Sequence, residues 1–364
     1  MPPDLKDPRP VSVPPVIGDA ILDAEPLRHG QANAATGGIW RVRGPIGTAI
    51  FKVARRPAVT DPSKTFPTSD EPTHWNYWRR EALAYQSGLA GAAYVEAGIT
   101  APALLEAGPR PDGGFELWLA DVGGIGGFEW PVPRLALFAR GLGAAQARWA
   151  GSVPATPWLS RRWLAQYIAE APNWIGPFEP AAWDHPDLTP WPEPVRTQLR
   201  ELWADRARIL AVAEAAQRTL CHLDVWPANL ADDGGTSVLL DWAFVGEGAV
   251  GEDLANLIVD SFTDGLMDMA LLPELAEAAV DGYLAGLRDG GWAGSGDAVR
   301  AAVHACGAAK YSWFGPAMAT RAVRGDLGRS SYRQDTSAAD AIRRLTPLVT
   351  LLADWAQSAW RSVA

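Results

Sequence analysis

The sequence contains few cysteines and no long apolar run. Its two cysteines, Cys221 and Cys306, are too few for a disulfide framework. No stretch of about 18 uncharged apolar residues is present, so we expect no membrane-spanning helix and no membrane partner. The first residues, MPPDLKDPRP, lack the basic region and apolar core of a secretory signal. We therefore expect a globular, cytoplasmic protein.

Positive charge is scarce as well. The 32 lysines and arginines face 42 aspartates and glutamates, which gives a net charge of −10. A chain of this charge is not expected to bind nucleic acid or anionic lipid as its main activity. The sequence also has no H-E-x-x-H, paired C-x-x-C or serine-elbow motif, so zinc and hydrolase chemistry lack support. The excess of carboxylates slightly favours a cationic small-molecule ligand.

The pattern of the chain changes near residue 122. Residues 1–16 are proline-rich and predict a mobile tail. Residues 17–122 contain alternating apolar strands and one helical stretch, and they predict a small, strand-rich N-terminal lobe. Residues 123–364 carry apolar residues at helical spacing and predict a larger helical C-terminal lobe. The predicted fold class is therefore α+β with two lobes.

Two segments of the helical part have contrasting patterns. Residues 195–217 have apolar residues on one face and predict a single amphipathic helix. Residues 172–194 contain seven prolines, and we expect no regular helix there because proline removes a backbone donor.

The segment LCHLDVWPANLADDGGTSVLLDWAF carries the polar residues of a phosphoryl-transfer site. Asp224 and Asn229 are five residues apart, the spacing of the catalytic loop pattern H-R-D-x-x-x-x-N, and Asp241 follows a short apolar strand. Carboxylate and amide oxygens are the ligands that Mg²⁺ prefers. Phosphoryl transfer also needs a carboxylate that faces the incoming hydroxyl. We therefore predict Asp224 as the catalytic residue and Asn229 and Asp241 as metal ligands, with His222 supporting the loop structurally.

The segments CHLDVWPANL and VLLDWAF resemble the aminoglycoside phosphotransferase and choline kinase family, which has the protein-kinase-like fold. The resemblance implies ATP and Mg²⁺ as cofactors and a small molecule with a hydroxyl group as the acceptor. It also implies a phosphate-binding lysine on the third strand and a partner glutamate on the following helix, and Lys52 and Glu81 match these roles by position. Glu71 is closer in sequence but lies in a loop-like segment before a proline. Backbone groups around Ala120 and Val122 are the implied adenine contacts.

A glycine string competes with this interpretation. Gly246, Gly248 and Gly251 form the pattern G-x-G-x-x-G, which is typical of dinucleotide-binding turns. That turn belongs to repeated βαβ units, which the surrounding pattern does not contain. We predict instead that these glycines let the chain turn from a strand into the next helix, whose start Asp253 would stabilise.

The sequence thus predicts an ATP-dependent kinase that acts on a hydroxyl group of a small molecule. Trp174, Trp183 and Trp191, together with the segment KYSWFG from Lys310 to Gly315, could stack on a sugar or nucleoside ring or could only pack in the core. The charge and the tryptophans favour an aminoglycoside-type antibiotic or an aminosugar. The alternatives are a metabolic sugar or amino-alcohol kinase and a nucleotide-binding regulatory protein without turnover.

Overall fold

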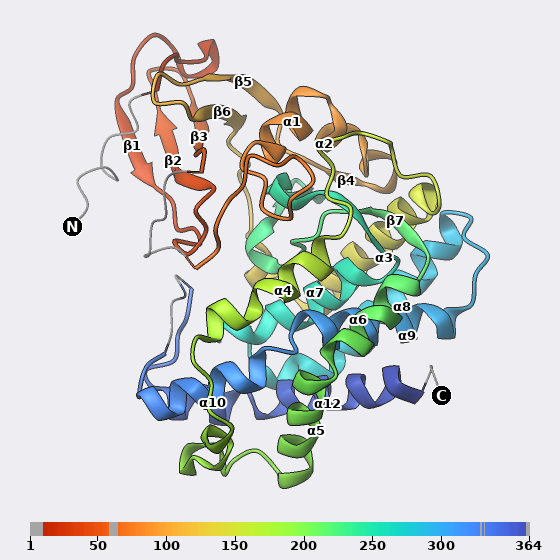
Figure 1. Ribbon diagram of the computed structural model, residues 1–364. Helices are drawn as coiled ribbons and strands as arrows, with labels where there is room; N and C mark the ends of the chain where they lie inside the picture. The colour runs from red at the N-terminus through yellow and green to blue at the C-terminus, as the bar shows by residue number, and fades with distance from the viewer. Residues whose placement is uncertain (1–9, 58–64, 328–329, 331, 362–364) are drawn as a thin grey trace.

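The protein has a strand-rich N-terminal part and a helical C-terminal part (Figure 1). The structure, a computed structural model, describes residues 10–57, 65–327, 330 and 332–361. Most of the predicted tail lies outside these ranges. Its described end contacts the sheet, because the backbone N–H groups of Val11 and Ser12 donate to the Glu116 carboxylate at 3.0 and 3.3 Å. The lobe boundary that we predict near residue 122 falls just after a strand.

An antiparallel sheet forms the N-terminal part, with the strand order β1-β2-β3-β6-β5. The strands are β1 (Asp23–Pro26), β2 (Thr36–Arg43), β3 (Thr48–Ala54), β6 (Phe115–Ala120) and β5 (Leu104–Pro109). Side chains alternate between the two faces of a strand. Phe51 packs on one face between Trp40 and Trp118, at centroid distances of 5.6 and 4.7 Å. Lys52, the next residue of the central strand, therefore faces the other way, toward the helical part.

The sheet is joined to the helical part by short elements. A long connection after β3 leads into α1 (Arg80–Gln86), which is followed by α2 (Leu89–Ala92) and β4 (Ile99–Thr100). Strand β4 pairs in parallel with β9 (Thr236–Leu239), which pairs in turn with β8 (Leu230–Asp233). A separate pair, β7 (Arg218–Cys221) and β10 (Gly246–Ala249), is antiparallel. These small sheets flank the segment that carries the predicted catalytic residues.

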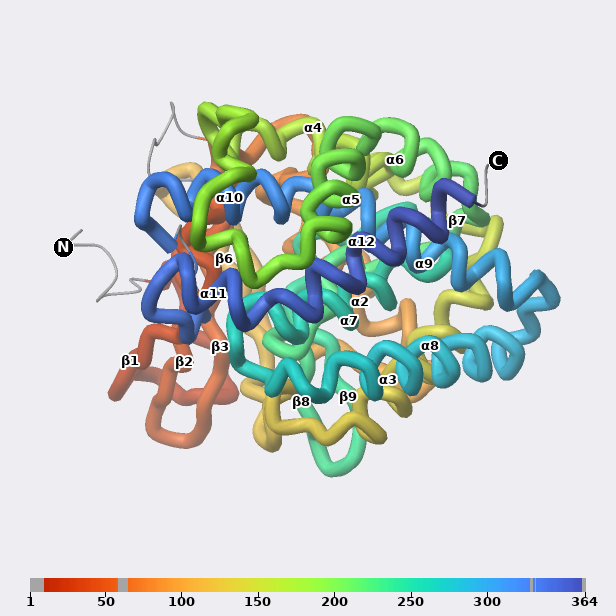
Figure 2. The backbone as a smooth tube through the Cα atoms, turned by 90° about the horizontal axis from the view of Figure 1, so that it is seen from below, coloured from red at the N-terminus to blue at the C-terminus, as the bar shows by residue number. Residues whose placement is uncertain are grey.

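Helices make up the rest of the C-terminal part. They are α3 (Val132–Trp149), α4 (Trp163–Ile175), α5 (Glu193–Ala204), α6 (Arg206–Ala215), α7 (Glu252–Thr263), α8 (Leu272–Asp289), α9 (Gly296–Lys310), α10 (Phe314–Arg324), α11 (Ala338–Arg344) and α12 (Thr346–Arg361). Helix α12 packs against α5 and α9 (Figure 2). Glycine allows α3 and α8 to approach closely, since a Cβ at Gly286 would lie 1.8 Å from the carbonyl oxygen of Arg140.

No helix in the described part of the chain combines the length and the apolar character needed to cross a membrane.

Candidate active site

The predicted catalytic loop lies between β7 and β8 and folds around the Asn229 side chain. Asn229 Nδ2 donates to the Asp224 carboxylate at 2.8 Å and to the Asp224 carbonyl at 2.9 Å. The chain turns here through the 3₁₀ helix η7 (Pro227–Asn229), which begins with a proline. The Leu240 N–H donates to the Asn229 carbonyl at 2.8 Å. Side-chain bonds therefore hold the loop itself, and a backbone bond ties it to the end of the β9 strand.

His222 is buried beneath this loop. Its Nδ1 accepts a hydrogen bond from the Asp224 N–H at 3.3 Å, and its ring meets Trp242 edge to face at a centroid distance of 5.1 Å. Burial lowers the pKa of His222 to about 4, so the ring is neutral at physiological pH. A neutral, fully buried ring supports the structural role that we predict for it.

Asp253 holds the start of the loop. It lies in the first turn of α7, as predicted, but its carboxylate accepts hydrogen bonds from the backbone N–H groups of His222 and Leu223 at 2.8 and 2.7 Å. Gln146 Nε2 donates to the same carboxylate at 2.7 Å. Sequence reasoning assigned Asp253 only to its own helix, because its partners lie on segments that are distant in the chain.

Lys52, Glu81 and Asp241 form one cluster. Lys52 Nζ lies 2.6 Å from Glu81 Oε2 and 2.9 Å from Asp241 Oδ1. The predicted pairing of Lys52 with Glu81 is thus formed, whereas the Glu71 carboxylate accepts from Thr73 in the same exposed loop. Lys52 on β3 is paired with Ile39 on β2 and with Leu117 on β6, and this register fixes its position along the strand.

Burial and ion pairing set the charges of this cluster. Burial acts to lower the pKa of Lys52, but the carboxylates of Asp241 and Glu81 outweigh it and raise that pKa. Burial acts to raise the pKa of Asp241, but the Lys52 ammonium outweighs it and lowers that pKa. Lys52 and Asp241 are therefore an ionised pair, while burial raises the pKa of Glu81 to about 7.

Backbone strain marks the same two segments. Among the described residues, the non-glycine positions with positive φ are Leu223, at 69°, and Asp241, at 58°. Such conformations cost on the order of 1–3 kcal/mol and cluster at functional sites. One of these residues precedes Asp224, and the other is the predicted metal ligand.

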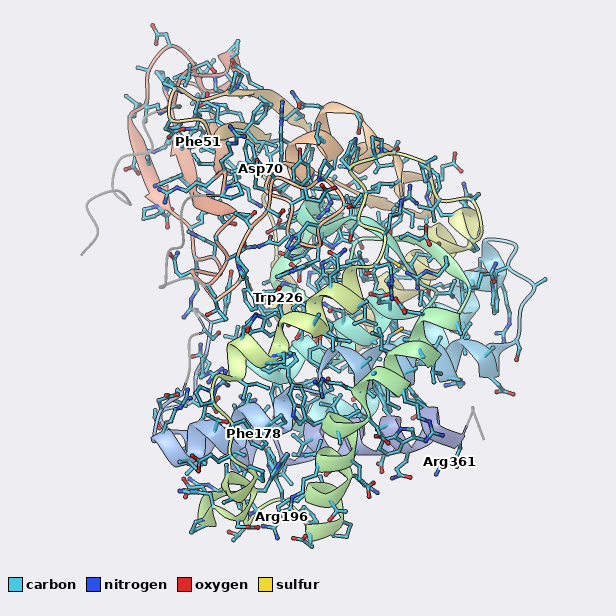
Figure 3. All side chains as sticks on the ribbon, in the orientation of Figure 1. Phe51, Asp70, Phe178, Arg196, Trp226 and Arg361 are labelled. Atoms are coloured by element: carbon cyan, nitrogen blue, oxygen red, sulfur yellow. The ribbon has the colours of Figure 1, made fainter. Side chains whose placement is uncertain are left out.

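A single large cleft of about 2100 Å³ joins these groups. It is lined by seven of the eight predicted site residues: Lys52, Glu81, Ala120, Val122, Asp224, Asn229 and Asp241. Trp226, at the level where the sheet meets the helices, also lines it (Figure 3). The Ala120 N–H already donates to the Ala103 carbonyl at 2.9 Å, so an adenine contact at Ala120 would have to use its carbonyl.

The glycine string has two structural uses. Gly246 and Gly248 lie within β10, where a Cβ at Gly246 would lie 2.2 Å from the Ser160 carbonyl oxygen. Gly251 has a φ of 100° and makes the predicted turn into α7. The first two glycines thus serve close packing, and only the third makes the turn that we expected of all three.

The helical side of the cleft contains three residues that sequence reasoning missed, Trp163, Tyr167 and Asp260, beside Lys310 of the segment that we singled out. Trp163 and Tyr167 of α4 stack at a centroid distance of 4.7 Å and line the cleft together with Asp260 of α7 and Lys310 of α9. Of the three tryptophans that we singled out, Trp174 also lines it. The other two are buried in the core, where Trp191 Nε1 donates to the Ile342 carbonyl at 2.9 Å and the Arg200 guanidinium lies over the Trp183 ring.

The donor set suits a hard divalent cation. Asn229 uses its amide nitrogen on Asp224, which leaves the side-chain oxygen for a metal, and Asp241 has a second carboxylate oxygen besides the one that contacts Lys52. Within the described ranges, no group of three or more histidine, cysteine, aspartate or glutamate side chains could hold a metal by itself. A site of two protein ligands completed by phosphate oxygens and water is the arrangement typical of Mg²⁺.

Comparison with known proteins identifies the class. Residues 124–294 match the model of the phosphotransferase enzyme family. The predicted resemblance is thereby confirmed for this part of the chain, which is similar to phosphotransferase enzymes. No curated protein is similar enough in sequence to count as a relative.

Solved structures confirm the protein-kinase-like fold. A microcompartment-associated aminopropanol kinase aligns with a TM-score of 0.51 at 15% identity, over 95% of this chain and 94% of that one. Choline kinase LicA from Streptococcus pneumoniae aligns with a TM-score of 0.50 at 13% identity, over 92% of this chain and 95% of that one. An aminoglycoside-3'-phosphotransferase of type VIII gives 0.44 at 20% identity, over 80% and 93% of the two chains. At these identities the likeness to the first two structures concerns the fold alone.

Proposed function

We propose that the chain is an ATP- and Mg²⁺-dependent kinase that phosphorylates a hydroxyl group of a small molecule. The observation that carries this proposal is the convergence of two groups on one cleft. These are the Lys52–Glu81–Asp241 cluster and the Asp224–Asn229 pair. Catalysis of phosphoryl transfer is mainly positioning and charge stabilisation, and these groups supply both.

Each group has a defined task in this proposal. Lys52, oriented by Glu81, binds nucleotide phosphate oxygens as a cation. Asn229 and Asp241 would hold Mg²⁺, which neutralises charge on the phosphates when it is bound. Asp224 accepts a hydrogen bond from the acceptor hydroxyl and takes its proton. The hydroxyl oxygen forms the new bond to the γ-phosphorus as the bond to the leaving ADP breaks.

The decisive variant is Asp224→Asn, which keeps the size of the side chain but removes the proton acceptor. We expect transfer to fall by about 100- to 10,000-fold, the range that a positioned general base contributes. ATP binding, measured by calorimetry with Mg²⁺, should stay within about twofold of the wild type, since no phosphate contact is removed.

Asp233→Asn is the matched control, because Asp233 is exposed at the end of β8 and does not line the cleft. Turnover at the wild-type rate in Asp224→Asn would refute the assignment of the base. ATP binding by the wild type without consumption across sugars, nucleosides, amino alcohols and aminoglycosides would instead favour the regulatory alternative. The predicted aminoglycoside or aminosugar acceptor stays a prediction that this panel tests.

A further inference from the structure

Lys310 is a lysine ammonium enclosed by aromatic rings. It is one of four lysines in the chain and has only 7% of its surface exposed. Its Nζ lies 4.9 Å from the ring centroid of Trp163, 5.8 Å from that of Tyr167 and 5.4 Å from that of Tyr311. Cations within about 6 Å of a ring centroid are attracted by the ring face. Three rings therefore stabilise one ammonium group.

The arrangement follows from three separate helices. Trp163 and Tyr167 are four residues apart on α4, which places them on the same side of that helix. Lys310 is the last residue of α9, and Tyr311 follows it. Asp260, on α7, provides the nearby carboxylate. The cage is thus built by the packing of α4, α7 and α9 rather than by a local motif.

The ammonium keeps hydrogen-bonding capacity toward the cleft. Its carboxylate partner, Asp260 Oδ2, lies 3.6 Å away, which is longer than an ordinary hydrogen bond of about 2.7–3.2 Å. A lysine ammonium has three N–H donors. Lys310 and Asp224 line the same cleft, and the Lys310 charge acts to lower the pKa of Asp224. Lys310 therefore faces the same cleft as Asp224, where an acceptor could contact both residues.

A cage of ring faces is the usual binding site for an ammonium group of a ligand. Here a side chain of the protein fills that position, so a ligand ammonium would meet like charge where it would otherwise find rings. An anionic acceptor is disfavoured too, because it would approach the carboxylates of Asp224 and Asp260, which line the cleft together with Lys310. A neutral ligand with several hydroxyl groups meets neither penalty and can accept hydrogen bonds from the ammonium.

We propose that Lys310 binds the acceptor and selects a neutral, polyhydroxylated small molecule, such as a sugar or nucleoside, over a cationic one. This proposal rests on the proposed kinase function and narrows its substrate class. The rings of Trp174 and Trp313, perpendicular to each other at a centroid distance of 6.0 Å, also line the cleft and offer an apolar surface to a sugar ring. The acceptor would donate its reacting hydroxyl to Asp224 and accept from Lys310 through a neighbouring one.

The first test needs no turnover. Tetramethylammonium chloride is titrated into the wild type and into Lys310→Ala, and binding is followed by calorimetry. The alanine variant should bind this cation at least about tenfold more tightly than the wild type, since the ring faces become free. Lys310→Arg is the matched control and should behave as the wild type, because a guanidinium keeps the cage filled. Equal affinity of the wild type and Lys310→Ala for tetramethylammonium would overturn the proposal.

The second test measures phosphorylation of neutral sugars and nucleosides against aminoglycosides and choline. The wild type should prefer a neutral acceptor. In Lys310→Met, which keeps the packing of the side-chain stem, the KM for that acceptor should rise at least about tenfold, with a much smaller change in kcat and in the KM for ATP. A wild type with higher kcat/KM for a cationic acceptor would refute the selection of neutral ones. Absence of transfer to every compound would instead refute the kinase function. The tetramethylammonium titration needs no turnover, so its result would still stand.

Discussion

Asp224 is a buried carboxyl group that lines the cleft with other carboxylates. Burial raises its pKa to about 7, while Lys310 acts to lower it and Asp241 and Asp260 act to raise it. A general base is most effective when its pKa lies near the working pH, because it is then both ionised and able to hold a proton. The surroundings of Asp224 place its pKa in this range.

The activity should therefore depend on pH in a defined direction. A base must be deprotonated, so kcat/KM for the acceptor should fall as the pH drops below about 7, by up to tenfold per pH unit. Initial rates at saturating MgATP and low acceptor concentration measure this dependence.

The free energy of unfolding should change with pH in the direction opposite to that of the activity. Burial raises the folded-state pKa values of Asp224 and Asp253 to about 7, so the folded state holds protons that the unfolded state releases. The lowered pKa of His222 acts in the opposite direction, but the two carboxyl groups outweigh it, so the free energy of unfolding should decrease as the pH rises from about 4 to 7. Activity and stability that fall together at low pH would point to unfolding and would contradict our assignment of the activity loss to Asp224.

At the scale of elements, helix α1 is held by the residue beside Glu81. The Arg80 side chain is fully buried, and its guanidinium donates to backbone carbonyls on three segments: those of Pro72, His74, Trp75, Trp158 and Ala243. The planar fork of an arginine suits this arrangement, because its five donors have fixed directions. Arg80 thus ties α1 both to the connection that precedes it and to the segment after Asp241.

We expect Arg80→Met to lower the free energy of unfolding by more than about 3 kcal/mol, since each buried carbonyl left without a donor costs roughly 1–3 kcal/mol. Urea denaturation measures this change. Arg140→Gln is the control, because the Arg140 guanidinium is half-exposed, pairs with Asp289 on the surface and should matter little. Similar urea midpoints of unfolding for the two variants would show that Arg80 does not anchor α1.

Local patterns in the sequence predict elements well where neighbours in the chain decide the outcome. The alternation in TAIFKVA identifies β3 over Thr48–Ala54, and the spacing in HLDVWPAN identifies the loop that joins Asp224 and Asn229. The helix predicted over residues 195–217 is instead two helices, α5 and α6, which meet at Asp205. Apolar periodicity does not reveal such a break, because both helices pack against α12 and the apolar pattern continues across Asp205.

Roles that depend on distant segments were not predicted, even for residues that the sequence singled out. Arg80, Asp253 and Lys310 look like ordinary surface charges in sequence, and their burial arises only when separate elements meet. One signal was present for Lys310. Lysine accounts for only four of the 32 basic residues, and two of those four, Lys52 and Lys310, line the cleft.

For the whole molecule, the connection between β3 and α1 joins the two parts. Trp75, in this connection, packs against Trp163 and Tyr167 of α4 and against Phe244, at centroid distances of 6.1, 5.6 and 5.8 Å. Its backbone N–H donates to Gln166 Oε1 at 2.6 Å. The connection therefore docks an aromatic side chain of the N-terminal part into the helical part.

Trp75→Ala should lower the free energy of unfolding by about 3–5 kcal/mol, as expected when a buried tryptophan leaves a cavity. It should also speed hydrogen exchange in α1 and α4, because the two helices lose their shared packing. Trp292→Ala, at a partly buried tryptophan outside this cluster, is the control and should leave exchange in α4 unchanged. Unchanged exchange in α1 and α4 of the Trp75 variant would mean that the connection does not join the two parts.

The anchoring of α1 has a consequence for the regulation of activity. In protein kinases, movement of the helix that carries the glutamate partner of the lysine switches activity on and off. Here Arg80 and Trp75 fasten that helix to the C-terminal part. If the proposed kinase function holds, we expect α1 to keep its position with and without ligands, so that activity follows the supply of nucleotide and acceptor.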